Sequence, residues 1–232
     1  MRYRTHNLDG VIVVDKPLGL SSMDVVRRVR RAAGHAKTGH AGTLDPLATG
    51  VVICCLGKAT KCINALMDGV KIYEAEVDLS AFTNTDDREG EREEVDVMEP
   101  PEEAAIQASL EQLTGDIEQV PPRYSAVHVN GQRAYKLARQ GEDVELQPRR
   151  VVVHAIELQH YAWPLAKLKV TCGKGVYIRS LARDLGKLLG VGGHLASLRR
   201  TAVGRFTLEH AHAIARFEQP LTQADLIAID EL

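Results

Sequence analysis

The order of apolar and polar residues predicts a chain in which strands and helices mix. The apolar run at residues 10–14 predicts a short strand that ends at the turn residues following it. Further strands are expected at 51–56, 71–79, 151–158 and 167–172. In the strand at 71–79 apolar and acidic residues alternate, which places Tyr73 on the apolar face. Strict strand–helix–strand alternation is absent, so the pattern predicts an α+β fold with a mixed sheet.

Helical spacing predicts helices at about 21–34, 58–67, 102–113 and 177–189. Ser21 or Ser22 can cap the first helix, and Asp24 suits its first turn. One side of this helix is apolar and the opposite side is basic. The two sides are Val25, Val26, Val29, Ala32 and Ala33, and Arg27, Arg28, Arg30 and Arg31. The last helix is expected to bury Ile178, Leu181, Leu185 and Leu188.

Three segments are expected outside this regular structure. Residues 34–50 form a glycine-rich loop, and residues 83–101 read as an exposed acidic loop. Residues 121–150 are basic and turn-rich, and we expect a peripheral element there.

Composition limits the function classes that remain. With 232 residues, 44% hydrophobic and 26% charged, the chain is typical of a globular protein. The four cysteines have no C-x-x-C spacing, so we expect a reducing cytoplasm, no disulfide framework and no metal site. No signal peptide or membrane span is expected.

Net charge is −2, so any nucleic-acid surface must be local. Three basic clusters meet that condition, while acid gathers at 74–103 and at the C-terminus. The clusters are Arg27, Arg28, Arg30, Arg31 and Lys37; Arg123, Arg133, Lys136, Arg139, Arg149 and Arg150 with Tyr124 and Tyr135; and Lys174, Arg183, Lys187, Arg199, Arg200 and Arg205.

The densest chemical signal is GHAGTLDPLATG, residues 39–50. Asp45 stands in its middle, and no other acid occurs between Asp24 and Asp45. An Asp-Pro pair in a loop is often only a turn. A carboxylate in a basic environment, however, stays ionised and can act as a nucleophile or base. No phosphate-loop or dinucleotide motif is present, and a glycosidase would need a second carboxylate.

GHAGTLDPLATG resembles the catalytic motif of the TruB family of tRNA pseudouridine synthases. Six further segments resemble motifs of the same family in the same order, from about residue 9 to 210. They are GVIVVDKPLGLSS, KIYEAEV, TNTDDREG, VPPRYSA with NGQRAYKLARQG, GKGVYIRSLARDLG and GGHLASLRRTAVGRF. Two positions depart from the family pattern: Asn84 replaces the usual Asp, and Ser80 replaces the usual glycine before that loop.

The resemblance implies a pseudouridine synthase catalytic domain over 1–232 with an RNA-gripping insertion at about 121–150. It also leads us to expect a short form without the C-terminal PUA-type domain of many relatives. The implied reaction converts the T-loop uridine of tRNA (position 55) to pseudouridine, after base flipping and without a cofactor or metal. We expect tRNA as the partner, no membrane, no obligate protein partner, a monomer and a cytoplasmic location.

The implied site contains one catalytic carboxylate and several helpers. Asp45 attacks the sugar or removes a sugar proton, and Arg179 is its expected ion-pair partner. Tyr73 lies against the base and handles a proton in the last step. The substrate-binding residues implied are His40, which takes the place of the flipped base, with Tyr73, Tyr177, Leu198, Asp87 and Lys16. Asp87 is also expected to brace Arg179 or its own loop.

Two other functions are also compatible with the sequence. The chain can be a tRNA-binding or tRNA-folding protein whose catalysis is dispensable. It can also be a subunit of a guide-RNA-directed complex, although such relatives depend on the additional C-terminal domain.

Overall fold

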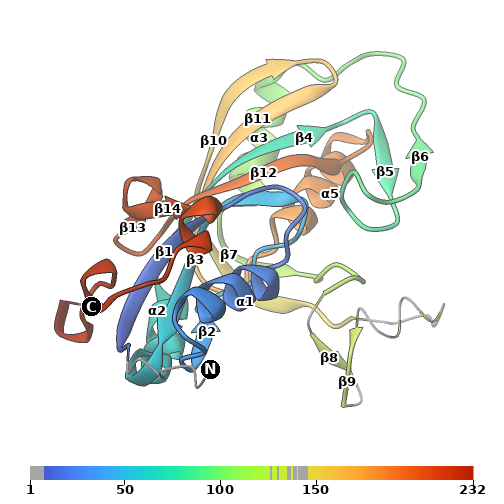
Figure 1. The fold of residues 1–232 in the computed structure, drawn as a ribbon. Coiled ribbons are helices and arrows are strands. Elements are labelled where there is room, and N and C mark those ends of the chain that lie inside the picture. The colour runs from blue at the N-terminus through green and yellow to red at the C-terminus, as the bar shows by residue number, and fades with distance from the viewer. Residues whose placement is uncertain are drawn as a thin grey trace. The chain divides into compact units, whose positions relative to one another are not determined.

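The computed structural model describes residues 8–125, 127–129, 131–134, 137, 140 and 146–231. The chain divides into two compact units, Met1–Ile72 with Arg199–Leu232 (unit 1) and Tyr73–Leu198 (unit 2). Figure 1 shows the elements of both. Within the described residues, no helix is long and apolar enough to cross a membrane.

Unit 1 is built on a sheet whose strand order is β14–β1–β3–β12. The neighbours β1 and β3 run antiparallel, with Lys16 opposite Gly50, whereas β1 and β14 run parallel. Short strands β2 and β13 pair with β3 and β12. The bounds are β1 Gly10–Lys16, β2 Thr38–His40, β3 Ala48–Leu56, β12 His194–Val203, β13 Phe206–Thr207 and β14 Ala211–Ala213.

The core of unit 1 explains why these segments are strands. Residues 51–56 of β3 are all fully buried, and Val11 and Val13 of β1 pack against them. A strand that is buried on both faces needs a continuous apolar run rather than alternation. This is the pattern that the sequence has at 51–56.

Helix α1 (Ser22–Ala32) follows β1. Ser21 caps it: its Oγ accepts from the Asp24 backbone N–H at 3.2 Å, and the Asp24 carboxylate accepts from the Ser21 N–H at 3.0 Å. Val25, Val26 and Val29 are buried, as the helical spacing predicts. The remaining helices of unit 1 are η1 Gly57–Cys62, α2 Ile63–Asp68, η2 Leu208–His210, η3 Ile214–Glu218, η4 Gln223–Asp225 and η5 Ile229–Glu231.

Unit 2 contains two helices of ten or more residues within its described part, α3 and α5. Its strands follow the order β12–β4–β11–β10–β7, and β10 pairs antiparallel with both β11 and β7. Helix α3 packs against α5 and β10 (Figure 1). The bounds are β4 Lys71–Asp78, β5 Ala81–Thr83, β6 Arg92–Glu94, α3 Glu103–Gln112, β7 Gly115–Gln119, β8 His128–Val129, β9 Gln132–Arg133, β10 Arg149–Ala162, β11 Leu165–Cys172 and α5 Ile178–Leu189.

The α+β class and the mixed sheet are confirmed, and several local predictions are corrected. The strand predicted to end at Val14 extends to Lys16, and the loop predicted at 34–50 contains β2 and the start of β3. The exposed loop predicted at 83–101 contains β6 and a buried Asp87, 3% exposed. Leu188 is 45% exposed, because the buried face of α5 ends at Gly186.

Candidate active site

The loop that carries Asp45 lies between β2 and β3 and is tied to the start of α1. The Ser22 hydroxyl donates to the Leu44 carbonyl at 3.0 Å and accepts from the Leu44 N–H at 2.8 Å. Ser22 is 3% exposed, so water does not compete for these bonds. The Ala48 N–H donates to the Asp45 carbonyl at 3.1 Å and closes the turn. Asp45 itself is half-buried.

A buried arginine holds the same loop from β12. Arg200 is 2% exposed, and it donates to the carbonyls of Val51 (2.7 Å), Thr43 (3.2 Å) and Gly42 (3.2 Å). Gly50 has φ +104, and a Cβ there would lie 2.2 Å from the Arg200 carbonyl oxygen. The close approach therefore requires glycine at this position. The sequence placed Arg200 in an RNA-contacting cluster, which is wrong because its guanidinium is inside the unit.

Lys16, the last residue of β1, lies beside this loop with a fully buried side chain. Its ammonium donates to the carbonyls of Leu20 (2.7 Å), Pro17 (3.1 Å) and Pro46 (3.4 Å). Burial lowers the pKa of Lys16 to about 8, while the Asp45 carboxylate raises it and Arg200 lowers it further. Lys16 therefore joins the β1–α1 turn to the Asp45 loop, and its role in substrate binding stays a prediction.

His40 ends β2, five residues before Asp45. Burial and the nearby charge of Arg200 both lower the pKa of its half-buried imidazole, in that order of size. The ring is therefore mainly neutral near pH 7, and a neutral flat ring is suited to stacking on bases.

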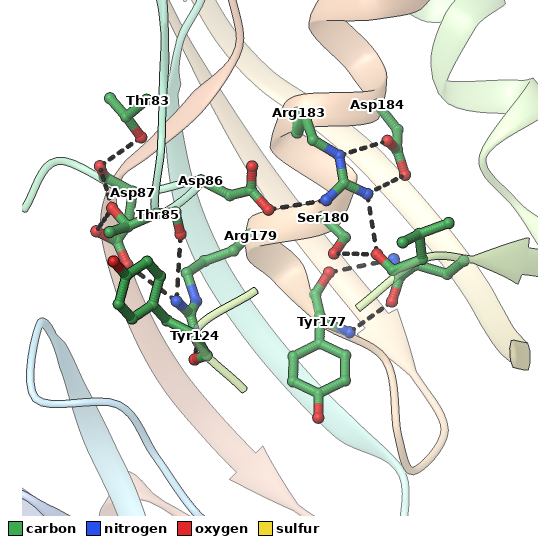
Figure 2. Close-up of polar contacts among 12 residues, drawn as sticks. Thr83, Thr85, Asp86, Asp87, Tyr124, Tyr177, Arg179, Ser180, Arg183 and Asp184 are labelled. Atoms are coloured by element: carbon green, nitrogen blue, oxygen red, sulfur yellow. Dashed lines mark hydrogen bonds and ion pairs between the residues drawn. The ribbon is translucent and has the colours of Figure 1, made fainter. Parts of the chain in front are cut away.

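Arg179, the second residue of α5, is 6% exposed and sits in a network of contacts (Figure 2). Its guanidinium donates to the Asp87 carboxylate at 3.2 Å, to the Thr85 carbonyl at 3.2 Å and to the Tyr124 carbonyl at 3.0 Å. Asp87 was expected to brace Arg179 or its loop, and the geometry matches that expectation. A buried Arg–Asp pair of this kind is costly to leave half-paired.

Asp87 is fixed independently of Arg179. Its carboxylate accepts from the Thr85 hydroxyl at 2.6 Å and from the Glu89 N–H at 3.0 Å. The Thr83 hydroxyl donates to the Asp87 carbonyl at 2.8 Å, and Asp87 forms a backbone bridge with Leu195 of β12. The carboxylate is therefore in place to orient the Arg179 guanidinium.

The first turns of α5 also hold residues 119 and 120, a connection that the sequence did not reveal. Buried Gln119 accepts from the Tyr177 N–H at 2.8 Å and donates to the Tyr177 carbonyl at 3.2 Å. The Ser180 hydroxyl donates to the Val120 carbonyl at 2.8 Å. With the Arg179–Tyr124 bond, these contacts fasten α5 to residues 119–124 (Figure 2).

Arg183, which the sequence assigned to RNA contact, lies mostly inside this network. Its guanidinium pairs with Asp86 at 2.8 Å and with Asp184 at 2.9 Å, and donates to the Val120 carbonyl at 2.9 Å. Its side chain is 14% exposed. The assignment is corrected, because two carboxylates already use its charge.

The three residues expected to surround the base, Tyr73, Tyr177 and Leu198, lie in unit 2. Tyr73 on β4 is 8% exposed and Leu198 on β12 is 8% exposed, so the apolar-face prediction for Tyr73 is confirmed. Tyr177 immediately precedes α5 and packs on a small cluster. That cluster is Val127, Ala134, Leu137 and Leu146.

The eight expected site residues thus divide between the units. Lys16, His40 and Asp45 belong to unit 1, whereas the other five belong to unit 2. The ion pair between Asp45 and Arg179 stays a prediction. Tyr135, Lys136 and Arg139 of the expected RNA-gripping insertion lie outside the described residues, as does the side chain of Arg133.

Two family models match consecutive parts of the chain. The N-terminal domain of TruB family pseudouridylate synthases matches residues 30–178, and the tRNA pseudouridylate synthase B C-terminal domain matches residues 179–229. The chain belongs to the TruB family. The first TruB model includes Asp45, Tyr73 and Asp87, and the second begins at Arg179.

Curated TruB relatives are similar over most of the chain. The tRNA pseudouridine synthase B of Thermobifida fusca (strain YX) is 53% identical over 211 residues, which cover 88% of this chain and 72% of the relative. That of Paracoccus denitrificans (strain Pd 1222) is 47% identical over 227 residues, which cover 98% of this chain and 76% of the relative.

Solved structures support the same fold. A Cbf5-Nop10-Gar1 complex matches with a TM-score of 0.70 and 32% identity, over 93% of this chain and 55% of the solved chain. An H/ACA RNP bound to a substrate RNA containing 2'-deoxyuridine matches with a TM-score of 0.66 and 30% identity, over 89% of this chain and 51% of the solved chain. The chain therefore spans about half the length of these two solved chains.

Proposed function

We propose that this TruB family chain isomerises uridine to pseudouridine in tRNA, at the T-loop uridine (position 55). The observation that carries the proposal is the 53% identity to the Thermobifida fusca tRNA pseudouridine synthase B over 88% of the chain. The bond from the sugar to the uracil nitrogen breaks, and the base rotates. A bond from the same sugar carbon to a ring carbon forms. That ring carbon loses a proton and the freed nitrogen gains one, so the reaction needs no cofactor.

Asp45 acts on the sugar, either as the nucleophile or as the base that removes a sugar proton. Both routes need an ionised carboxylate on a fixed backbone. The bonds from Ser22 to Leu44 and from Arg200 to Thr43 support this role, because they fix the loop on the N-terminal side of Asp45. Pre-positioning of the reacting group is a main source of rate acceleration in enzymes.

Arg179 orients Asp45, and Asp87 orients Arg179. Support for the second step comes from the 3.2 Å Asp87–Arg179 contact and from the independent bonds that hold Asp87. An arginine that is fixed before substrate binds has little side-chain entropy left to lose in the reaction.

The remaining residues handle the base. His40 takes the vacated place in the RNA stack, Tyr177 and Leu198 flank the flipped uracil, and Tyr73 serves the proton transfer at the ring carbon. Lys16 supports the Asp45 loop through the Pro46 carbonyl.

The test is pseudouridine formation on an unmodified tRNA transcript, with purified chain and no added protein, metal or cofactor. Wild type is expected to convert the transcript. Asp45→Asn is expected to lose activity while keeping its fold, and Asp230→Asn, an exposed carboxylate in the same unit, is the matched control. A wild type that binds tRNA without converting it points instead to an RNA-binding or RNA-folding protein. Activity without partners separates the proposal from a guide-RNA-directed subunit.

A further inference from the structure

We infer that the exposed side of α1, its arginine face, binds the phosphate backbone of the tRNA substrate beside the target nucleotide. The arginine face consists of exposed Arg27, Arg30 and Arg31 and half-buried Arg28. The inference rests on the proposed function and adds to it where the RNA strand lies on unit 1.

The charge of this face is largely uncompensated. Asp24 is the one acid of α1, and it is engaged in the capping box with Ser21 and in a 2.5 Å ion pair with Arg27. Arg28, Arg30 and Arg31 form no ion pair with any described residue. Three neighbouring like charges repel one another, and an external polyanion relieves that repulsion.

The position of the helix connects this charge to the reaction. α1 begins at Ser22, whose hydroxyl makes both hydrogen bonds to Leu44, the residue before Asp45. The helix then rises about 1.5 Å per residue, so Arg31 lies roughly 14 Å along the axis from Ser22. A strand that presents one nucleotide to Asp45 has its neighbouring phosphates within this range.

The helix dipole alone does not account for the arginine face. Cations in the last turn are favoured there, which suits Arg30 and Arg31. Arg27 and Arg28 lie in the middle of the helix, where the dipole stabilises a positive charge only slightly. Beyond the helix, exposed His35 and Lys37 continue the basic surface toward β2.

Two other candidate RNA surfaces are less favoured by the described residues. Arg183 and Arg200 of the third basic cluster are committed to internal partners. In the second cluster, the basic side chains that the structure describes are Arg123, Arg149 and Arg150, each exposed. The arginine face is favoured because its largely uncompensated charge lies on the helix that Ser22 ties directly to the Asp45 loop.

The experiment compares Arg30→Gln/Arg31→Gln with a control that removes two charges elsewhere, Lys167→Gln/Lys169→Gln on β11. The affinity for unmodified tRNA is measured across salt concentrations, together with kcat and KM for pseudouridine formation. Glutamine keeps a high helix propensity, and all four residues are at least partly exposed, so the folds are expected to survive. Equal melting temperatures, within a few degrees, check this.

We expect the arginine variant to bind tRNA roughly tenfold more weakly at about 0.1 M salt. Its log–log salt slope should fall by about one for each phosphate that the variant no longer neutralises. KM rises while kcat at saturating tRNA changes less than about twofold. The lysine control stays near wild type. A third variant, Arg30→Lys/Arg31→Lys, keeps the charge and is expected to keep the affinity.

Two results overturn the inference: an arginine variant with the affinity and slope of the lysine control, or a charge-keeping variant as weak as the glutamine variant. Neither bears on the proposed function, which depends on conversion by wild type. Failure of wild type to form pseudouridine, with the slope change still present, would remove the reaction and leave the RNA surface standing.

Discussion

At the scale of single residues, buried cations organise the Asp45 loop. Lys16 and Arg200 together make six hydrogen bonds to backbone carbonyls, three each. Such groups are hard to find from sequence, because a lysine or arginine in a motif reads first as a substrate contact. The error over Arg200 has this origin: burial, not residue type, decides whether a cation can reach a phosphate.

Replacement of Arg200 tests its hold on the loop. Arg200→Gln cannot reach three carbonyls, so we expect the free energy of unfolding to fall by about 2–4 kcal/mol. The rate at saturating tRNA should fall at least tenfold, because Asp45 is no longer held in place. Urea denaturation and single-turnover rates measure both effects. Arg205→Gln, at an exposed arginine in the same unit, is the control, and an active Arg200→Gln would contradict the prediction.

The depressed pKa of Lys16 predicts a pH-dependent stability. The folded pKa of about 8 lies below the ordinary 10.5, so between these values the unfolded chain binds the additional proton. Stability therefore rises with pH wherever the unfolded state holds more protons. The free energy of unfolding of wild type, minus that of Lys16→Met, is expected to increase between pH 8 and 10. Parallel curves for the two proteins would show that Lys16 does not titrate in this range.

At the scale of elements, the start of α5 is a junction. Arg179, Ser180 and Arg183 on one helix reach residues 85–87 and 120–124, and Gln119 bonds to the backbone of Tyr177. The sequence identified the helix and its apolar spacing, because helical periodicity is local. It could not identify Gln119, because a glutamine at the end of a strand carries no pattern.

Gln119→Leu tests this junction. Gln119 is 1% exposed, and loss of its two bonds leaves the Tyr177 N–H and carbonyl unsatisfied. We expect a loss of about 2–4 kcal/mol in the free energy of unfolding and a slower reaction, because Arg179 lies two residues further along. Gln112→Leu, at the exposed end of α3, should cost less than about 1 kcal/mol. Calorimetry and single-turnover assays compare the two, and similar losses in both variants would refute the junction.

At the scale of the whole molecule, the family resemblance predicted features that the periodicity of apolar residues did not. Alternation and helical spacing predicted strands β1, β3, β4, β10 and β11 and the helical segments at α1, η1–α2, α3 and α5. They missed β7 and β12 of the main sheet, short strands such as β2 and β6, and the ends of β1 and β10, because these depend on pairing between distant segments. The resemblance led us to expect that Asp87 braces Arg179 or its own loop, although the local composition around Asp87 indicated an exposed acidic loop. Spacing along a chain cannot show that Asp87 contacts an arginine 92 residues further along the sequence.

Charge separation over the whole chain predicts how the reaction responds to salt. Net charge is −2, yet the arginine face of α1 is basic while residues 91–94 and 102–103 are exposed and mostly acidic. Binding of tRNA by local cations releases counterions, so kcat/KM should fall steeply between about 50 and 200 mM salt. The chemical step moves no charge between protein and solvent, so kcat at saturating tRNA should change less than about twofold. Steady-state assays at matched Mg²⁺ measure both constants. If kcat falls in parallel with kcat/KM, salt acts on the folded enzyme or the RNA structure, and the local-cation account of recognition fails.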